Sequence, residues 1–218
     1  MLIRVFIKNF LSFDEETVLS LYPGKGTEQR HVIPGKKRDD IPALKTAVIY
    51  GANASGKSNF TKAIFFIKQL VAEGKPLAET LYQPFKLGND EKKASKIELE
   101  IKIGDAQYAY GIDFNKNEIK EEWLVKINKR TEKLIYERKN YKQKVEVEFS
   151  NVKFENAKKR QFAEFLGEGT PRNRPFLKEA IERNLNFIDE MNEVYGWFIN
   201  SLNVISPKSR VRGLEFNL

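Results

Sequence analysis

The sequence predicts an α/β fold with a flanking antiparallel β-sheet and C-terminal helices. A short apolar run at 47–50 precedes a glycine-rich segment at 51–58, and apolar side chains at helical spacing follow it through residue 72. Residues 96–149 alternate between apolar and charged side chains, as strands with one buried face do. From residue 154 onward the apolar spacing becomes helical. Together, these patterns indicate a strand–loop–helix unit beside a sheet.

The composition is that of a globular chain forming one large domain or two small ones. Its 218 residues are 41% hydrophobic and 31% charged, and no apolar run approaches the roughly 18 residues that a membrane helix needs. The absence of cysteine excludes disulfides and thiolate chemistry, and the single histidine, His31, excludes a multi-histidine zinc site. The net charge of +8 permits a nucleic-acid or nucleotide partner. Because the opening residues lack a signal peptide's cleavage site, we expect a cytoplasmic protein with no membrane partner.

Two strands and a loop are expected before the glycine-rich segment. Residues 2–9 alternate in polarity, and residues 15–21 form a second short strand pattern. Residues 22–45 are rich in glycine, proline and charge, which predicts a loop. The run at 47–50 then fits a short strand buried in a parallel sheet. The helix after the glycine-rich segment is expected to end at 73–74, where a glycine supplies a stop.

The segment 51–58 is a full match to G-x-x-x-x-G-K-[ST], the phosphate-binding loop or P-loop. Its glycines let the backbone curl so that successive N–H groups point at phosphate oxygens, and the helix N-terminus adds partial positive charge. Lys57 is suited to reach the β- and γ-phosphates, and the Ser58 hydroxyl to ligate Mg²⁺. An ordinary glycine-rich turn is the alternative, but the strand pattern before the loop and the helix pattern after it disfavour that interpretation.

The remainder of the chain is expected to form hairpins and then helices. The hairpin of 97–103 and 108–114 turns at a Gly-Asp pair, and Asn115–Glu118 makes the next turn. That turn lacks the Asp of a GTPase's guanine-reading motif, which argues against a GTPase. The later elements are predicted as strands at 119–128, 133–139 and 144–149, and as helices at 154–166 and 175–202.

Several of these features resemble the SMC/RecF-type ATP-binding cassette (ABC) ATPases. The opening strand ends in NFLSF at residues 9–13, and the loop carries Asn53 at its third position and Asn59 directly after Ser58. Residues 82–87, the strand-rich region and the helix around Trp197 resemble a bacterial subfamily of these ATPases. Its members are often found in anti-phage defence, as relatives of the RloA and Septu ATPases.

The resemblance implies a P-loop ATPase that binds ATP and Mg²⁺. It implies that Gln83, 25 residues after Ser58, is the glutamine that meets Mg²⁺ and the attacking water. A surface-turn glutamine is the alternative. It further implies that two heads of a homodimer or higher oligomer sandwich two ATPs, and that their closure controls an effector in DNA or phage sensing. The residues expected at the nucleotide are Ser12, Phe13, Gly51, Asn53, Ala54, Ser55, Gly56, Lys57, Ser58 and Asn59, with Lys57 and Gln83 catalytic and Ser58 and Gln83 on the metal.

Two motifs that a complete ATPase of this type needs are not found in the sequence. Residues 166–169 only loosely match the signature motif, since they lack its serine and end a helix. Asp189 and Glu190 follow two apolar residues, as Walker B carboxylates do, but the pattern around them is helical. We therefore expect the N-terminal part of a longer ATPase, or one piece of a split one. Residues 1–150 would form the first lobe of the head and 151–218 the helical start of the second. Alone, the chain is expected to bind ATP weakly and to hydrolyse it negligibly.

Other function classes remain open at this point. Eight Lys and Arg residues lie between 126 and 144, with Tyr136 and Tyr141 among them. This run is suited to contact DNA or RNA phosphates, although such runs are also typical of the solvated face of hairpins. A P-loop small-molecule kinase would need an Arg-rich lid, against which the long antiparallel sheet argues. A pure nucleic-acid-binding module would not need an intact P-loop.

Overall fold

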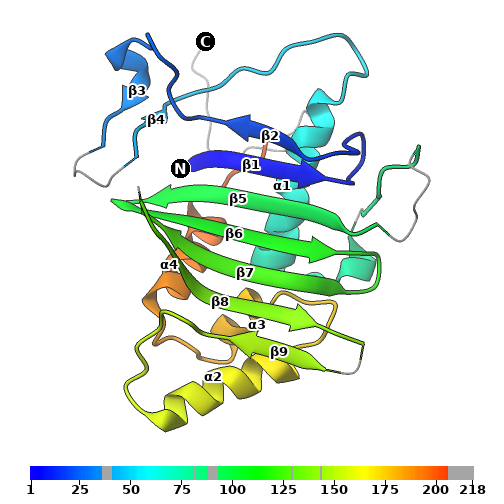
Figure 1. The fold of residues 1–218 in the computed structure, drawn as a ribbon. Coiled ribbons are helices and arrows are strands. Elements are labelled where there is room, and N and C mark those ends of the chain that lie inside the picture. The colour runs from blue at the N-terminus through cyan, green and yellow to red at the C-terminus, as the bar shows by residue number, and fades with distance from the viewer. Residues whose placement is uncertain (36–40, 81, 88–92, 129, 143, 206–218) are drawn as a thin grey trace, which may run out of the picture.

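The computed structural model has an antiparallel sheet at its centre, with helices on one face (Figure 1). It describes residues 1–35, 41–80, 82–87, 93–128, 130–142 and 144–205. In this part of the chain seven strands pair antiparallel in the order β2-β1-β5-β6-β7-β8-β9. The strands are β1 (Leu2–Lys8), β2 (Thr17–Ser20), β5 (Ser95–Ile103), β6 (Ala106–Phe114), β7 (Ile119–Ile127), β8 (Glu132–Asn140) and β9 (Val145–Glu148).

These strands confirm the ones predicted from alternation in the opening segment and in the strand-rich region. Successive side chains of each strand point to opposite faces, so β1 and β5 place apolar side chains toward the core and mostly charged ones on the other face. Within its described part, the segment 22–45, predicted as a loop, also contains short secondary-structure elements. A 3₁₀ turn, η1 (Gln29–His31), leads into a short two-stranded ladder of β3 (Val32–Ile33) and β4 (Ala43–Leu44).

The predicted strand at 47–50 does not form, so that prediction is wrong for this structure. These residues belong to no strand, and Val48 and Tyr50 are 81% and 91% exposed. The apolar run has the composition of a buried strand, but a strand also needs a neighbour to pair its backbone N–H and C=O groups. The main sheet ends at β2 and β9, and among the described residues no strand pairs with this segment.

The helix after the glycine-rich loop forms as predicted, whereas the long helix predicted at 175–202 is two helices. α1 (Lys57–Lys68) continues as a π-helical turn, η2 (Gln69–Glu73), and stops at Gly74 with φ of 65°. The C-terminal region folds into α3 (Phe176–Glu182) and α4 (Asp189–Asn200), separated by Asn184 with φ of 64°. A left-handed residue cannot continue a right-handed helix, so the chain reverses there. The remaining helical elements are a 3₁₀ turn, η3 (Leu77–Glu79), and α2 (Ala157–Gly169). α2 confirms the helix predicted at 154–166, but it begins and ends three residues later.

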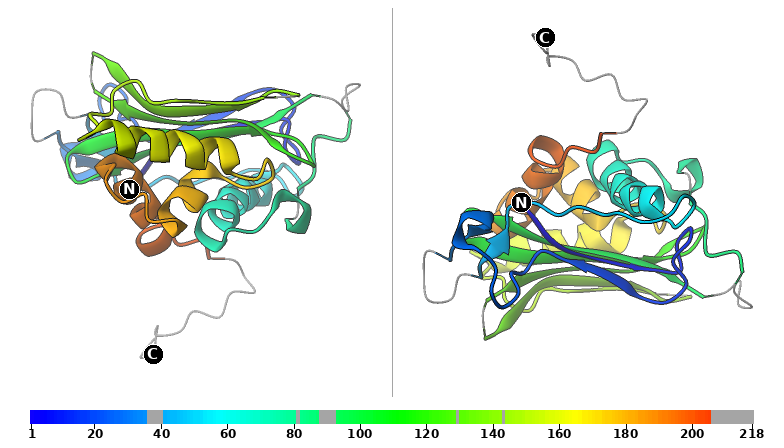
Figure 2. Two further views of the ribbon diagram at one scale, coloured as in Figure 1. Left: turned by 90° about the horizontal axis from the view of Figure 1, so that it is seen from below. Right: turned by 90° about the horizontal axis from the view of Figure 1, so that it is seen from above.

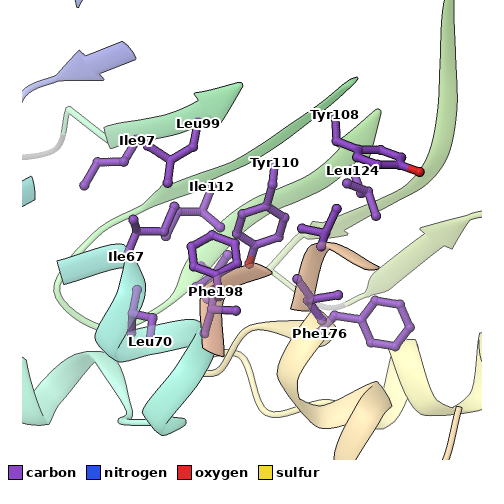
Figure 3. Close-up of a cluster of buried hydrophobic side chains, with 14 of the residues drawn as sticks. Ile67, Leu70, Ile97, Leu99, Tyr108, Tyr110, Ile112, Leu124, Phe176 and Phe198 are labelled. Atoms are coloured by element: carbon purple, nitrogen blue, oxygen red, sulfur yellow. The ribbon is translucent and has the colours of Figure 1, made fainter. Parts of the chain in front are cut away.

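The hydrophobic core lies between the sheet and the helices. Figure 2 shows the helices gathered on one face of the sheet, and Figure 3 shows the side chains between them. Ile97, Leu99 and Ile112 of the sheet face Ile67 and Leu70 of the first helical segment, and all five are fully buried. The same core extends to the later helices, where Tyr110 packs edge-on against Phe198, with ring centroids 5.4 Å apart. One continuous core therefore holds α1 and the C-terminal helices on a common sheet.

A buried carboxylate joins the sheet to α3. Glu122 on β7 is 0% exposed and accepts hydrogen bonds from the Tyr110 and Tyr136 hydroxyls, at 3.0 and 2.7 Å. It also accepts from the backbone N–H groups of Phe176 and Leu177, at 2.5 and 2.9 Å. The negative charge lies at the N-terminus of α3, where unpaired amides and the helix dipole stabilise it. Burial, together with the charge of Glu122, raises the pKa of both tyrosines well above the ordinary value, so both hydroxyls stay protonated donors.

The face of the sheet away from the helices carries charged side chains in contact with one another. The Arg4 guanidinium donates to both carboxylate oxygens of Glu100, and the Tyr22 hydroxyl donates to Glu100 at 3.0 Å. These contacts explain why Glu100 is buried although it faces away from the core. Asp113 lies on the same face, and its buried Oδ1 has no hydrogen-bond partner within the described residues. Burial raises the pKa of the Asp113 carboxyl.

Candidate functional site

The glycine-rich loop leads directly into α1, as the motif predicts. Gly56 occupies the cap position before Lys57 with φ of 93°, a left-handed conformation that favours glycine. A Cβ at Gly56 would lie 2.7 Å from the Ser12 hydroxyl oxygen, so a larger residue would also have to displace the Ser12 side chain. The first turn of α1 contains no acidic residue that would repel an anion. This helix N-terminus is therefore suited to bind phosphate through its backbone amides.

Lys57 folds back over the loop. Its ammonium donates to the carbonyl oxygens of Gly51 and Ala52, at 2.8 and 2.6 Å, and lies 3.5 Å from the Ser55 hydroxyl. Carbonyl oxygens are weaker partners for an ammonium than phosphate oxygens, which form charge-assisted bonds. A phosphate bound in the loop could therefore replace the two carbonyl oxygens as the partner of the Lys57 ammonium.

The other predicted loop residues lie where a phosphate and a metal could reach them. Ser58 is exposed in the first turn of α1, and Asn53, Ala54 and Ser55 are exposed on the loop. Asn59 accepts a hydrogen bond from Lys62 through its side chain, at 3.2 Å. The set of donors, a lysine, helix-terminal amides and a serine hydroxyl, fits a Mg²⁺-bound nucleotide phosphate chain.

The turn that follows β1 brings a second predicted residue to the loop. Phe10 and Phe13 exchange backbone hydrogen bonds at 2.9 and 3.0 Å, and the turn contains Leu11 with φ of 53°. Ser12, at its tip, lies against Gly56. Phe13, by contrast, packs against the hydrophobic core. The structure therefore brings Ser12 to the P-loop, while the Phe13 side chain is used in packing.

Gln83 is attached to the same turn by its backbone. The Leu11 N–H donates to the Gln83 carbonyl oxygen at 2.9 Å. The Gln83 side chain is exposed and borders a cavity of about 150 Å³ on the flank of α1, together with Lys62 and Gln69. The structure thus connects the Gln83 segment to the turn that touches the P-loop. Its role toward metal or water stays a prediction.

Sequence reasoning missed the part that Asn9 plays in this arrangement. Asn9 is 4% exposed with φ of 47°, and its carboxamide accepts from the Phe85 N–H at 3.2 Å and donates to the Lys93 carbonyl at 2.7 Å. Its own carbonyl accepts from the Ser95 hydroxyl. Only a side chain with both a donor and an acceptor can bridge these segments. The NFLSF pattern was the available signal, since asparagine tolerates the left-handed conformation better than most residues.

The acidic and histidine side chains that the structure describes form no cluster suited to bind a metal ion. Asp189 and Glu190 lie in the first turn of α4, which confirms the helical prediction, and Glu190 is 3.3 Å from the Lys126 ammonium. His31 is an exposed residue of η1 beside Arg30. Across the described ranges no group of three or more His, Cys, Asp or Glu residues could hold a metal ion.

The basic run at 126–144 is divided between structural and exposed positions. Arg138 is 1% exposed and donates to the carbonyl oxygens of Gly167 and Thr170 at the end of α2. Lys139 is paired with Glu121 and Glu137. Arg130, Lys133, Lys142 and Lys144 are exposed, and Lys144 is paired with Glu146. Lys126 is paired with Glu190, and Lys129 lies outside the described residues.

A comparison with protein families matches residues 47–216 to the family described as "AAA domain, putative AbiEii toxin, Type IV TA system". The chain belongs to this family. It is an AAA/ABC-like P-loop ATPase domain, of a family that in general hydrolyses nucleotides, and its fold is α/β with a mostly antiparallel sheet and C-terminal helices. No curated protein matches the chain. In the part of the domain that the structure describes, no helix has the length and apolar character needed to cross a membrane.

Proposed function

We propose that the domain binds Mg·ATP as the N-terminal part of an SMC/RecF-like ATPase head, related to the RloA and Septu ATPases. The observation that carries the proposal is the contact between Ser12 and Gly56. It joins the turn of the opening strand to the phosphate-binding loop. These are the two segments whose sequences resemble that ATPase type, and here they form one surface.

The proposed division of labour follows from the positions of the side chains. Lys57 leaves its contacts with the Gly51 and Ala52 carbonyls and binds the β- and γ-phosphates, while the loop amides hold the phosphate oxygens. The Ser58 hydroxyl and the Gln83 carboxamide are the groups available to Mg²⁺. Bound Mg²⁺ supplies charge neutralisation on the phosphate oxygens. Ser12 contacts the phosphate chain from the side of the opening turn.

The exposed segment at 47–50 is an argument that further strands pair with this domain. Its apolar side chains and unpaired backbone are those of a strand without a neighbouring strand, and such a segment readily pairs with further strands. We expect these strands to come from a C-terminal half of a longer ATPase or from a separate chain of a split one. A second head would then supply the groups missing from the site, and closure on ATP would control an effector in DNA or phage sensing.

Contact with DNA or RNA through the basic run is part of the same proposal. Arg130, Lys133 and Lys142 are exposed cations of the run, and Lys144 is exposed but paired with Glu146. Arg130 and Lys142 lie in the turns that flank β8, and Lys133 lies near the start of β8. Because phosphate contacts are electrostatic, such binding would weaken steeply with salt. Arg138 is excluded from this role, since it is buried and holds the end of α2.

Calorimetry with Mg·ATP and Mg·GTP tests the nucleotide assignment. A charge-assisted contact contributes about 1.5–3 kcal/mol, so Lys57→Ala should lower the affinity for ATP by roughly ten- to a hundredfold. Lys116→Ala, at an exposed lysine of the β6–β7 turn, is the matched control and should bind like the wild type. Equal ATP binding by the wild type and a folded Lys57→Ala variant would refute the assignment, and a preference for GTP would redirect it.

A further inference from the structure

The exposed face of α2 presents aromatic side chains between opposite charges. The helix buries Ala163, Leu166 and Gly167, and Gly167 lies so close to β9 that a Cβ there would be 2.5 Å from Val147. On the outer face Phe165 is 70% exposed, and at its flank Phe162, which packs on one side against Phe187 with ring centroids 6.4 Å apart, is still 39% exposed. The two neighbouring rings therefore give this helix an apolar surface that a partner could cover.

The charges on α2 are opposite to those that its dipole favours. The first turn has no acidic residue and the last turn has no basic residue, whereas Lys158, Lys159 and Arg160 follow one another at the N-terminal end. Acidic side chains at the N-terminus and basic ones at the C-terminus would stabilise the helix. Lys159 and Arg160 are paired with Glu155 and Glu164. The position of exposed Lys158 is therefore not explained by the stability of the helix.

The C-terminal end of α2 lies beside an acidic hollow. Glu168 and Glu164 line this hollow of about 380 Å³ together with side chains of β8 and β9. Five glutamates and two lysines line it, so it carries an excess of negative charge. Lys158 and Glu168 are ten residues apart, which corresponds to about 15 Å along a helix. The two aromatic side chains lie between them along the helix.

We propose that α2 pairs antiparallel with α2 of a second copy of this chain. A two-fold axis near residue 163 places Lys158 of each copy opposite Glu168 and the acidic hollow of the other. The same axis places Phe165 of each copy against Phe162 and Gln161 of the other. Such an interface uses one patch twice, as closed two-fold dimers do, and the antiparallel helix dipoles attract each other.

This contact is distinct from an ATP-dependent closure of two heads. α2 packs under β9 at one edge of the sheet, whereas the turn that carries Ser12 joins β1 and β2 at the other edge (Figure 1). The α2 pair therefore forms without nucleotide and leaves the P-loop uncovered. A single pair of crossing helices is smaller than the roughly 1,200–2,000 Å² of stable interfaces, so the dimer is weak and depends on protein concentration.

Sedimentation velocity without nucleotide, from about 10 µM to about 1 mM of the full chain, tests the proposal over the range expected for a small interface. The wild type should shift from monomer toward dimer across this series. Phe165→Ser and Lys158→Glu should each remain monomeric at concentrations where the wild type is half dimeric. The charge swap Lys158→Glu with Glu168→Lys should restore dimerisation. The matched controls are Leu87→Ser, at an apolar residue that is 86% exposed, and Lys116→Glu, and both should behave like the wild type.

Lys57→Ala separates this interface from the proposed ATPase function. It should dimerise like the wild type without nucleotide, even though its affinity for ATP is lowered. A wild type that stays monomeric throughout would overturn the proposal, and so would Phe165→Ser that self-associates like the wild type. Dimerisation that requires ATP and is lost in Lys57→Ala would assign the contact to the heads and overturn the α2 interface, while leaving the proposed function intact.

Discussion

Replacing the buried carboxylate Glu122 by glutamine should destabilise the domain without changing its shape. Oε1 of Glu122 accepts from Tyr110, Tyr136 and the Leu177 N–H, and Oε2 accepts from the Phe176 N–H at 2.5 Å. Glutamine can keep the first three contacts through its oxygen, but its NH₂ group would then face the Phe176 N–H, donor against donor. A lost hydrogen bond to a charged group costs about 1.5–3 kcal/mol, so we expect a loss of about 2–3 kcal/mol.

Thermal unfolding followed by circular dichroism measures this loss. For a chain of this length 1 kcal/mol corresponds to about 2–4 °C, so the midpoint should fall by about 5–10 °C. Glu121→Gln is the matched control, because Glu121 is the adjacent residue on the opposite face of the sheet and pairs with Lys139 at 3.3 Å. It should change stability by no more than about 0.5 kcal/mol. If Glu122→Gln melted at the same temperature as Glu121→Gln, the buried carboxylate would not be holding α3 to the sheet.

Three further variants follow from local geometry. Gly56→Ala should weaken Mg·ATP binding about tenfold or more in calorimetry, because Gly56 has a left-handed backbone and the added Cβ would lie against Ser12. Gly169→Ala is the control and should bind normally, because a Cβ at Gly169 would have nothing within 4 Å. Asn9→Gly keeps the left-handed conformation but loses the carboxamide bridge, so amide exchange in 82–87 should accelerate, and unchanged exchange would contradict the bridging role. Asp113→Asn should stabilise the domain at pH 7 by about 0.5–1 kcal/mol in urea unfolding. The folded pKa of Asp113 is raised, so the folded state binds more protons just above the unfolded pKa and stability falls as pH rises through that window. The gain should therefore vanish at a pH below the unfolded pKa, and a gain that persists there would refute it.

Local patterns were sufficient to predict most of the elements. Alternation in polarity predicted the strands of the sheet, because a strand with one buried face must alternate. The P-loop motif predicted the start of α1, since its glycines and Lys57 are needed at the turn itself, and Gly74 predicted its end. The helical stripe around Asp189 and Glu190 correctly excluded them from a buried strand. Each of these predictions depends only on residues that lie close together in the sequence.

The errors arose where the outcome depended on distant segments. The run at 47–50 has the composition of a strand, yet a strand forms only where another strand pairs with its backbone. The break between α3 and α4 depends on Asn184 and on packing of both helices against the sheet, which the apolar stripe alone does not reveal.

The sequence by itself determined the class of the domain and the position of its P-loop motif before α1, because both depend on short-range spacing. Only the tertiary structure decided which polar side chains are buried. Glu122 and Arg138 belong to strands whose charged residues were expected to face water, but each is held by backbone groups at a helix end more than 25 residues away in the chain. The tertiary structure also decided that Ser12 lies against Gly56, since the two are brought together by the packing of α1 on the sheet beside β1. A buried charge or a contact across the chain depends on desolvation and partners that local periodicity does not encode.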